Sequence, residues 1–551
     1  MYDNIDYSNL SLYGFLVKLS ESRMDLEALE YFGKKFTYSS LINNIDKTAN
    51  ALIVAGVKKG DKVSICLPNT PEAVFSFYAI NKIGAIANMI HPMSAENEIV
   101  HYLTVSESDI IIGLDLVSNK IAKAMEKTNT KKLIVVSVKE SMPFFLGIGY
   151  SIKSKKPDIP LTATSWKEFM AGASSVNSDN LDQVSGDDCA AILYSGGTTG
   201  KPKGIMLSNY NFNALAVLSI EACRGLKEGM RFFAIMPIFH GFGLGVGIHS
   251  ALVLGGVAVI LPSFKASEFH KLLMKYRPNL IAAVPAIYES MIKHKDFFAG
   301  KDLSFLKVII SGGDSLSLNT KKKVDDLLKS CNCDSEVREG YGMTESVTGS
   351  CLLPVGISKP GSCGFPYSEM TYRIVDPKTN EEVPTGEVGE ITYTGPTIMI
   401  GYLNDKEETD NTIKVDEQGR RWLHTGDIGY IDEDGFVYFK QRLKRMIVSG
   451  GYNIYPQIIE NVIDSHPDVL ASAVVGVPDT VMGEICKAVI EFKSQDVDKD
   501  KALAEIKDAC KQNVARYALP REYIAIEHMP RTLVGKIAYN ELIEMYKDKQ
   551  N

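Results

Sequence analysis

The sequence predicts an α/β protein with a large N-terminal domain, made of two α/β subdomains and a β-rich subdomain, and a small α+β C-terminal domain. Strand-like apolar runs such as KVSICL (62–67) alternate with helical patterns through the first ~260 residues, which is typical of largely parallel sheets. From about Gly361 the chain changes to short strands separated by turns. A further break near Arg442 begins a different order of elements.

The N-terminal domain is expected to cover residues 1–441. The segment PEAVFSFYAINKIGAIA (71–87) has helical spacing and predicts one helix. The run AAILYS (190–195) predicts a buried strand, and the alternation of strands and helices resumes at LIAAVP (280–285) and LKVIISGG (306–313). Because 551 residues exceed what one hydrophobic core normally supports, at least two domains are required.

The C-terminal domain is expected to cover residues 442–551. Its predicted order is helix, strand, strand, helix, strand, in the segments YPQIIENVIDSH (455–466), ASAVVGV (471–477), KAVIEF (487–492), KALAEIKDACKQNV (501–514) and EYIAIE (522–527). A unit of roughly 110 residues lies within the usual size range of a domain.

The composition is that of an ordinary soluble protein that acts on small molecules. The chain has 45% hydrophobic and 23% charged residues. Its net charge of −7 argues against nucleic acid as the main partner, because nucleic-acid binders usually carry a basic excess. The nine cysteines are odd in number and irregularly spaced, which suits a reducing compartment. The lone pair Cys331 and Cys333 is interpreted as two free thiols rather than a metal site.

The N-terminus, MYDNIDYSNL, lacks the features of a secretory signal, so we expect a cytoplasmic protein. No apolar run reaches the ~20 residues of a membrane-spanning helix. The apolar segment MPFFLGIGYSI (142–152) follows Lys139 and precedes Lys153, Lys155 and Lys156. A buried loop or helix is the favoured interpretation, and weak contact of residues 142–156 with a bilayer surface is the alternative.

The stretch YSGGTTGKPKG (194–204) predicts a phosphate-binding loop. Glycines allow successive N–H groups to point into one concavity, and hydroxyl side chains add further donors. The stretch is not a nucleotide-hydrolase P-loop, because Pro202 stands where that motif requires a hydroxyl residue. The residues expected to hold phosphate are Ser195, Gly196, Gly197, Thr198, Thr199, Gly200, Lys201 and Lys203.

Four further motifs follow in order: SGGDS (311–315), EGYGMTES (339–346), WLHTGDIGYIDEDGF (422–436) and PRTLVGKI (530–537). Together with the glycine-rich loop, they make the chain resemble the acyl-adenylate-forming superfamily of acyl-CoA synthetases, adenylation enzymes and luciferases. The resemblance covers nearly the whole chain. It implies that ATP activates a carboxylic acid to acyl-AMP, after which coenzyme A accepts the acyl group.

The resemblance also implies roles for residues of these motifs. Thr344 would bond the α-phosphate, and Glu345 would hold Mg²⁺, a cation suited to carboxylate and phosphate oxygens. Tyr341 would lie against adenine, and Asp427 would accept hydrogen bonds from the ribose hydroxyls. The remaining nucleotide-binding residues implied in this way are Gly312, Gly313, Asp314, Glu339, Gly340 and Gly342.

The C-terminal domain is implied to serve two half-reactions. Lys536 would bridge the carboxylate and the α-phosphate during adenylation, and Arg442 would contact ribose. Lys444 would be the hinge about which the domain rotates, so that Ser449, Gly450 and Gly451 then line the channel for CoA. Arg445 departs from the family pattern, because many relatives have an acidic residue there.

The segment 237–247, PIFHGFGLGVG, bears on the identity of the acid. It contains no acidic residue, so a substrate ammonium group would be buried without a partner. The alternating glycines leave room for an alkyl or aryl tail, although helix packing explains the spacing equally well. The expected acyl pocket comprises His240, which is also a candidate catalytic residue, and Gly241, Phe242, Gly243 and Gly245.

This segment and the pair Gly196–Gly197 favour a medium- or long-chain fatty acid. The alternatives are an aryl- or bile-acid-CoA ligase and a ligase that loads a carrier protein, which would share every catalytic motif. A luciferase-like oxygenase is a further alternative. A non-catalytic nucleotide-binding relative is disfavoured because the key residues are all present: Thr344, Glu345, Asp427 and Lys536.

Overall fold

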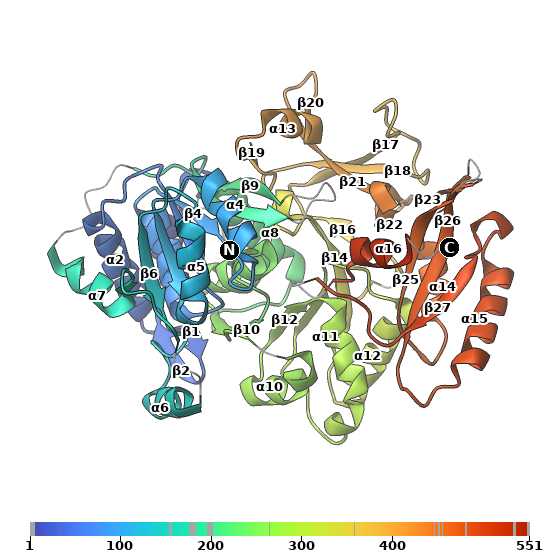
Figure 1. Cartoon of the computed structure of the whole chain (residues 1–551), viewed down its shortest axis with the longest axis horizontal. Helices are drawn as coiled ribbons and strands as arrows, with labels where there is room; N and C mark the ends of the chain where they lie inside the picture. Colours follow the sequence, from blue (N-terminus) through green and yellow to red (C-terminus); the bar gives the residue numbers. More distant parts are fainter. Residues whose placement is uncertain are drawn as a thin grey trace.

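The computed structural model describes residues 6–153, 157–175, 183–195, 202–263, 265–357, 359–445, 447–449, 452–454, 456–479, 482–532 and 536–547. Within these residues the chain forms four sheets with helices packed around them. The N-terminal elements lie at the left of Figure 1 and the C-terminal elements at the right, with the β-rich subdomain above the centre.

The first sheet is mainly parallel and includes the two strands, β8 and β9, that flank the expected phosphate loop. Its spatial order is β19 (Gly401–Tyr402), β9 (Lys203–Ser208), β8 (Cys189–Ser195), β4 (Ile86–Met89), β3 (Lys62–Cys66), β5 (Ile110–Leu114), β6 (Lys132–Val136) and β7 (Thr164–Ser165). The accompanying helices include α2 (Tyr38–Val54), α3 (Pro71–Lys82), α4 (Glu96–Ser106), α5 (Ser118–Met125) and α7 (Trp166–Ala171). Strands β8 and β9 form an antiparallel hairpin in which Ser195 faces Lys203.

The second sheet reverses strand direction only at its two edges. Its order is β16 (Phe365–Pro366), β15 (Cys351–Leu352), β14 (Val337–Tyr341), β13 (Val308–Ser311), β12 (Leu280–Ala283), β10 (Arg231–Ala234), β11 (Val257–Ile260), β1 (Glu27–Tyr31) and β2 (Lys34–Thr37). Its helices include α1 (Leu12–Ser20), α8 (Asn209–Cys223), α9 (Ser250–Leu254), α10 (Phe269–Tyr276), α11 (Pro285–Lys293) and α12 (Leu318–Ser330). The N-terminal hairpin β1–β2 joins this sheet by parallel pairing with β11, so the two subdomains share one continuous core.

The third sheet is the β-rich subdomain expected from the turn-rich sequence. It contains β17 (Thr371–Val375), β18 (Gly389–Thr394), β21 (Arg421–Ile431), β20 (Ile413–Val415) and β22 (Val437–Arg442), with α13 (Lys406–Thr412) beside it. All of its strand pairs are antiparallel.

The fourth sheet lies in the C-terminal region with hydrophobic clusters of its own. It contains β24 (Tyr452–Ile454), β23 (Ile447–Ser449), β26 (Gly483–Phe492), β25 (Val469–Asp479) and β27 (Glu522–Ile526), and its helices are α14 (Pro456–Asp464), α15 (Lys499–Asn513) and α16 (Tyr539–Lys547). Two clusters of buried side chains consist only of residues between Ile447 and Tyr546. The mixed α/β class, with a large N-terminal and a small C-terminal part, is therefore confirmed.

The predicted single helix at 71–87 is wrong at its end. Helix α3 begins as the sequence suggests, with the Thr70 side chain accepting a hydrogen bond from the Ala73 N–H and Pro71 in the first turn. It ends at Lys82, because Gly84 has a φ of +72° and turns the chain into β4. Strand β4 is central and buried, so the sequence leading into it is mostly apolar. Periodicity cannot distinguish a short, mostly apolar run from a helix.

The favoured interpretation of residues 142–152 as a buried element is also wrong. Residues Phe144–Lys153 do form a helix, α6, but its apolar side chains are exposed. In Figure 1, α6 lies at the lower edge of the molecule, below β2. Among the described helices, none has the length and apolar character needed to cross a membrane.

Candidate functional site

The site begins at the carboxyl ends of the parallel strands β13 and β14. Ser311 and Glu339 are register partners in these strands, so the loops that follow them start side by side. The first loop carries Gly312, Gly313 and Asp314; Tyr341 ends β14, and the second loop carries Gly342 to Glu345. This edge of an α/β sheet is where ligands usually bind.

The turn after β14 is tightly closed. A Cβ on Gly342 would lie only 2.5 Å from the Thr348 carbonyl oxygen, so only glycine fits there. Val347 and Thr348 have φ values of +53° and +70°, which β-branched residues rarely adopt. Such strain persists only where surrounding structure enforces it, and here it holds Thr344 in a buried 3₁₀ turn.

The Glu345 carboxylate is buried and positioned by a distant tyrosine. The Tyr402 hydroxyl of β19 donates to Glu345 Oε1 over 3.0 Å. Burial raises the pKa of Glu345, whereas the Tyr402 hydrogen bond and the charge of Arg442 favour the ionised form. Sequence reasoning missed Tyr402, because nothing local to it indicates which carboxylate it reaches.

Lys203 reaches the same region from β9. Its ammonium forms an ion pair with Glu408 and lies 5.2 Å from the centre of the Tyr402 ring. The expected phosphate ligand therefore has an acidic partner in this structure, and Glu408 is a second residue that sequence reasoning did not find.

Asp427 lies at the centre of a small polar network. The Tyr341 hydroxyl donates to Asp427 Oδ2 over 2.7 Å, and Arg442 Nε lies 3.3 Å from Asp427 Oδ1. Asp427 and Arg442 are register partners in β21 and β22, so the antiparallel pairing itself brings them together. Burial raises the pKa of Asp427, and the charge of Arg442 and the Tyr341 hydrogen bond oppose that rise.

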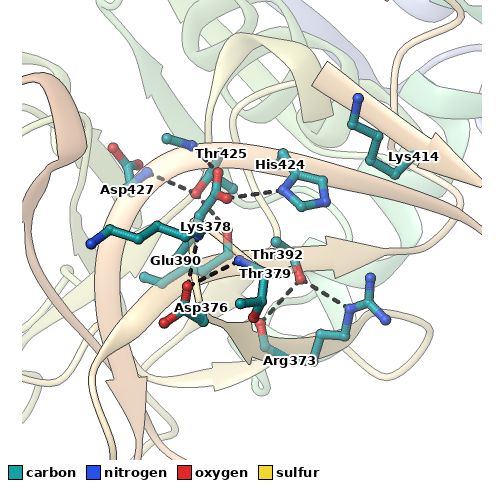
Figure 2. Close-up of polar contacts among 12 residues, drawn as sticks. Arg373, Asp376, Lys378, Thr379, Glu390, Thr392, Lys414, His424, Thr425 and Asp427 are labelled. Atoms are coloured by element: carbon teal, nitrogen blue, oxygen red, sulfur yellow. Dashed lines mark hydrogen bonds and ion pairs between the residues drawn. The ribbon is translucent and has the colours of Figure 1, made fainter. Parts of the chain in front are cut away.

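A second layer of side chains holds the part of β21 around Asp427, as Figure 2 shows. The Thr425 hydroxyl accepts from the Asp427 N–H over 3.0 Å and donates to the Ile391 carbonyl over 2.6 Å. The Glu390 carboxylate accepts from the Gly426 N–H and lies 2.9 Å from His424 Nδ1. These contacts fix the backbone that presents Asp427 to the site.

Lys536 reaches this cluster from the C-terminal region. Its Cε lies 3.7 Å from the position that a Cβ on Gly313 would occupy. Burial lowers the pKa of Lys536, and the negative charges of Asp314, Asp427 and Glu345 partly counteract this effect. The ammonium of the half-buried Lys536 thus lies near three carboxylates, beside the two loops.

Contacts between the C-terminal region and α11 and α12 hold Lys536 in this place. Arg531 Nη2 lies 3.4 Å from Glu289 Oε2, and the Asn319 side chain donates to the Asp464 carbonyl over 3.2 Å. We call this arrangement, with Lys536 at the site, the adenylation pose, after the role that the family resemblance implies for this lysine.

His240 precedes the π-helix η5 (Phe242–His249) and faces the same cluster. Its Nδ1 accepts a hydrogen bond from the Phe242 N–H over 3.2 Å. Burial and the charge of Lys536 lower the pKa of His240 to about 3, so the imidazole is neutral at pH 7. It can accept or donate hydrogen bonds there, but it cannot supply a positive charge.

The glycines of the expected acyl pocket differ in their surroundings. A Cβ on Gly243 would lie 2.2 Å from the Pro237 carbonyl oxygen, so the packing explanation applies to this residue. A Cβ on Gly245 would lie 2.6 Å from the end of the Leu215 side chain. A Cβ on Gly241 would lie 3.2 Å from the Thr348 side chain and 3.4 Å from the Val347 carbonyl carbon.

Several predicted residues lie outside this cluster or outside the described residues. Glu339 and Gly340 are half-buried within β14, and burial raises the pKa of Glu339 to about 7. Ser449 is buried in β23 and, in the described part of the chain, makes no hydrogen bond or ion pair to the cluster. The backbone of Lys444 lies in the 3₁₀ turn η9 (Leu443–Arg445). Residues Gly196, Gly197, Thr198, Thr199, Gly200, Lys201, Gly450 and Gly451 are not among the described residues.

The donor set fits Mg²⁺ only together with a phosphate-bearing ligand. Within the described ranges, no group of three or more His, Cys, Asp or Glu side chains is placed to hold a metal ion. Mg²⁺ is commonly bound through one or two carboxylates and the substrate's phosphates, with water completing the shell. The Glu345 carboxylate, oriented by Tyr402, meets that requirement.

Comparison with known proteins identifies this arrangement. Residues 18–403 match the family model of the AMP-binding enzymes, and residues 458–536 match the AMP-binding enzyme C-terminal domain. The chain belongs to the AMP-binding enzyme family. The resemblance to the acyl-adenylate-forming superfamily is thereby confirmed.

Several relatives of this AMP-binding enzyme are CoA ligases, and their sequences align with almost the whole chain. It is 33% identical to a long-chain-fatty-acid–CoA ligase of Bacillus subtilis, over 97% of this chain and 94% of the relative. It is 29% identical to 4-coumarate–CoA ligase 1 of Solanum tuberosum, over 92% and 88% of the two chains. ATP-bound MatB from Rhodopseudomonas palustris superposes with a TM-score of 0.83 at 26% identity, over 98% and 99%. The protein is an AMP-forming CoA ligase, and its substrates are a small carboxylic acid, ATP and CoA.

Proposed function

We propose that this enzyme converts a medium- or long-chain fatty acid to its CoA thioester. The observation that carries the proposal is the 33% identity, across 97% of the chain, to a ligase named for long-chain fatty acids. The segment 237–247 adds support, because it offers no carboxylate to a substrate ammonium group. The helix η5 that follows His240 is apolar and buried, so it could form one side of a pocket for an alkyl tail.

In the proposed first half-reaction, the fatty carboxylate attacks the α-phosphorus of ATP. A carboxylate oxygen–phosphorus bond forms, the bond between the α- and β-phosphates breaks, and pyrophosphate leaves with the electron pair. Two anions must approach each other, so fixed positive charge near the α-phosphate is the main requirement. Lys536 supplies that charge, and the Thr344 hydroxyl donates to an α-phosphate oxygen.

The remaining residues of the cluster hold the nucleotide in the proposed arrangement. Asp427 accepts from the ribose hydroxyls, assisted by Arg442, and Tyr341 lies against the adenine ring. Mg²⁺ held by Glu345 would neutralise phosphate charge. Neutral His240 borders the acyl side, where an uncharged ring does not compete with the ammonium of Lys536 for the carboxylate.

The proposed second half-reaction requires the C-terminal domain to rotate about Lys444. The CoA thiol loses its proton to solvent and its sulfur attacks the acyl carbonyl; the carbon–sulfur bond forms, the carbon–oxygen bond to AMP breaks, and AMP leaves with the electron pair. Movement of Lys536 away from the site would clear a channel lined by Ser449 and its neighbours. Domain closures of this kind are a common way to assemble a second site on one scaffold.

An aryl-CoA ligase is the second candidate, because 4-coumarate–CoA ligases align with the chain at 29% identity. ATP–pyrophosphate exchange across a carboxylate panel separates the two. For a fatty-acid ligase, each methylene buried contributes up to ~0.8 kcal/mol, so kcat/KM should rise about fourfold per methylene until the pocket is full. Exchange that is flat from acetate to palmitate but strong with benzoates, coumarate or bile acids would overturn the fatty-acid proposal.

The acceptor is tested separately. With the best acid of the panel, CoA and a phosphopantetheinylated carrier protein are offered in turn, and the thioester formed on each is quantified. We expect rapid consumption of CoA. If the thioester forms only on the carrier protein, the acceptor is a carrier protein and not CoA.

A further inference from the structure

Helix α6 presents an apolar surface to solvent at a place remote from the nucleotide site. Phe144 is 75% exposed, Phe145 85% and Ile152 78%, and Ile148 is also exposed. Figure 1 shows α6 projecting from the lower edge of the molecule, away from β13 and β14.

The exposed residues share one face of the helix. Phe144, Ile148 and Ile152 follow each other at intervals of four, and Phe145 lies one position from the first of them, so all four project within a ~100° arc. The helix contacts the protein through a different side, where Tyr150 packs against the core. An ordinary surface helix turns its apolar face inward, whereas α6 turns its apolar face outward.

The exposed apolar side chains of α6 are neighbours and form one continuous patch. Contiguous exposed apolar patches on soluble proteins mark interaction sites. Leu146 is also half-exposed on the flank of the helix, and in the described part of α6 no acidic side chain interrupts the apolar face.

Basic residues lie near the apolar face in the described structure, and more follow it in the sequence. Lys139 lies against the helix and donates to the Ser151 hydroxyl over 3.3 Å. Lys34 and Lys35 of β2 line a hollow together with Glu140 and Ser141, the residues that lead into α6. The sequence at the end of the helix adds Lys153, Lys155 and Lys156.

The acidic residues of this region are fewer. Glu140 and the buried Glu72 face the hollow, and Lys35 pairs with Glu27 over 2.6 Å. Between residues 139 and 156 the sequence has four lysines against one glutamate, whereas the whole chain carries a net charge of −7. The basic excess is thus local to α6.

We propose that α6 docks the enzyme onto the surface of an anionic lipid bilayer. Its apolar face would enter the boundary between headgroups and acyl chains, and the surrounding lysines would meet lipid phosphates. A second copy of the chain fits this surface less well, because a twofold contact would bring the same lysines against each other. The docking is independent of which acid the enzyme activates.

Cosedimentation of the full-length protein with vesicles tests the proposal. Vesicles of phosphatidylcholine alone are compared with vesicles containing about 30% phosphatidylglycerol, at low salt and at 0.5 M NaCl. We expect binding to the anionic vesicles that weakens with salt, because exposed charges are screened. The double variant Phe144→Ser/Phe145→Ser should lower the partition coefficient roughly tenfold or more, since each phenylalanine loses its burial in lipid.

Two further variants separate the contributions. Val415→Ser removes an exposed apolar side chain from β20, far from α6, and should leave vesicle binding unchanged. Lys153→Gln/Lys155→Gln/Lys156→Gln should reduce binding to anionic vesicles and weaken its salt dependence. ATP–pyrophosphate exchange with a short, water-soluble acid should be unchanged in all of these variants, which shows that they are folded.

Two results would overturn the proposal. The wild-type protein could remain in the supernatant with both kinds of vesicle, or the Phe144→Ser/Phe145→Ser variant could bind as well as the wild type. If instead the wild type forms a dimer in solution that this variant abolishes, without binding vesicles, the occupant of the surface is a second copy and not lipid.

Discussion

Replacement of Lys536 by alanine is expected to disable adenylation and spare the second half-reaction. In the present pose the lysine faces the carboxylates of Asp314, Asp427 and Glu345. In the proposed arrangement Lys536 is the positive charge beside the α-phosphate, whereas Arg442 pairs with Asp427 on the ribose side. The loss should therefore resemble that of a single preorganised charge-stabilising donor.

The magnitude follows from that comparison. Removing one such donor typically costs ~10²–10³ in rate, or about 3–4 kcal/mol of transition-state stabilisation. Stability should change little, because Lys536 is half-buried and its hydrogen bonds to Thr532 are made by its backbone. A loss of activity with an unchanged unfolding temperature is the expected signature.

The assay measures the two half-reactions apart. Pyrophosphate release from ATP and acid reports adenylation, and CoA consumption from supplied acyl-AMP reports thioester formation. Lys507→Ala, an exposed lysine of α15, is the matched control and should affect neither. Equal damage to both steps in Lys536→Ala would refute the reasoning that this lysine acts only in the adenylation pose.

The pH dependence of adenylation provides a second readout of the same lysine. Burial lowers the pKa of Lys536 below the ordinary 10.5, and the charged form is lost as pH rises through that lowered value. The kcat/KM of the wild type should therefore fall on an alkaline limb centred below 10.5. In Lys536→Ala this limb should be missing.

The other predictions concern the hinge, the metal and the acyl side. Lys444→Pro should preserve pyrophosphate release while CoA thioester formation falls, because proline fixes φ at the hinge; loss of pyrophosphate release alone would argue against a hinge there. Tyr402→Phe should raise the Mg²⁺ concentration needed for half-maximal adenylation about tenfold, because Glu345 loses its orienting hydroxyl, and an unchanged Mg²⁺ requirement would contradict this role. Gly243→Leu should abolish activity on all acids and lower the unfolding temperature, since its Cβ would meet a carbonyl oxygen at 2.2 Å. Gly241→Ala should instead raise KM for long acids while KM for ATP stays constant, and equal effects on acid and ATP would exclude Gly241 from the acyl pocket.

The motif residues that the sequence singles out converge because strand order brings them together. Gly312 follows β13 and Tyr341 ends β14, the parallel strand beside it, and Asp427 and Arg442 are register partners in a hairpin. Local patterns are sufficient to predict such strands and turns. The family resemblance supplies the roles, which spacing alone does not contain.

The residues that sequence reasoning missed act across large separations in the chain. Tyr402 reaches Glu345 over 57 positions, and Glu390 holds the backbone N–H of Gly426 over 36. No local periodicity encodes such contacts. The exposure of α6 was missed for a related reason: an apolar helical pattern indicates that one face is covered, but it does not say whether protein or something else covers it.

The most direct test of the central claim is a competition between acids. Equimolar decanoate, palmitate and 4-coumarate are incubated with the enzyme, ATP, Mg²⁺ and CoA, and the initial amounts of each CoA thioester are measured by mass spectrometry. The account predicts that decanoyl-CoA and palmitoyl-CoA together exceed coumaroyl-CoA by at least tenfold. Predominant coumaroyl-CoA would contradict it, leaving an AMP-forming CoA ligase with a different acid.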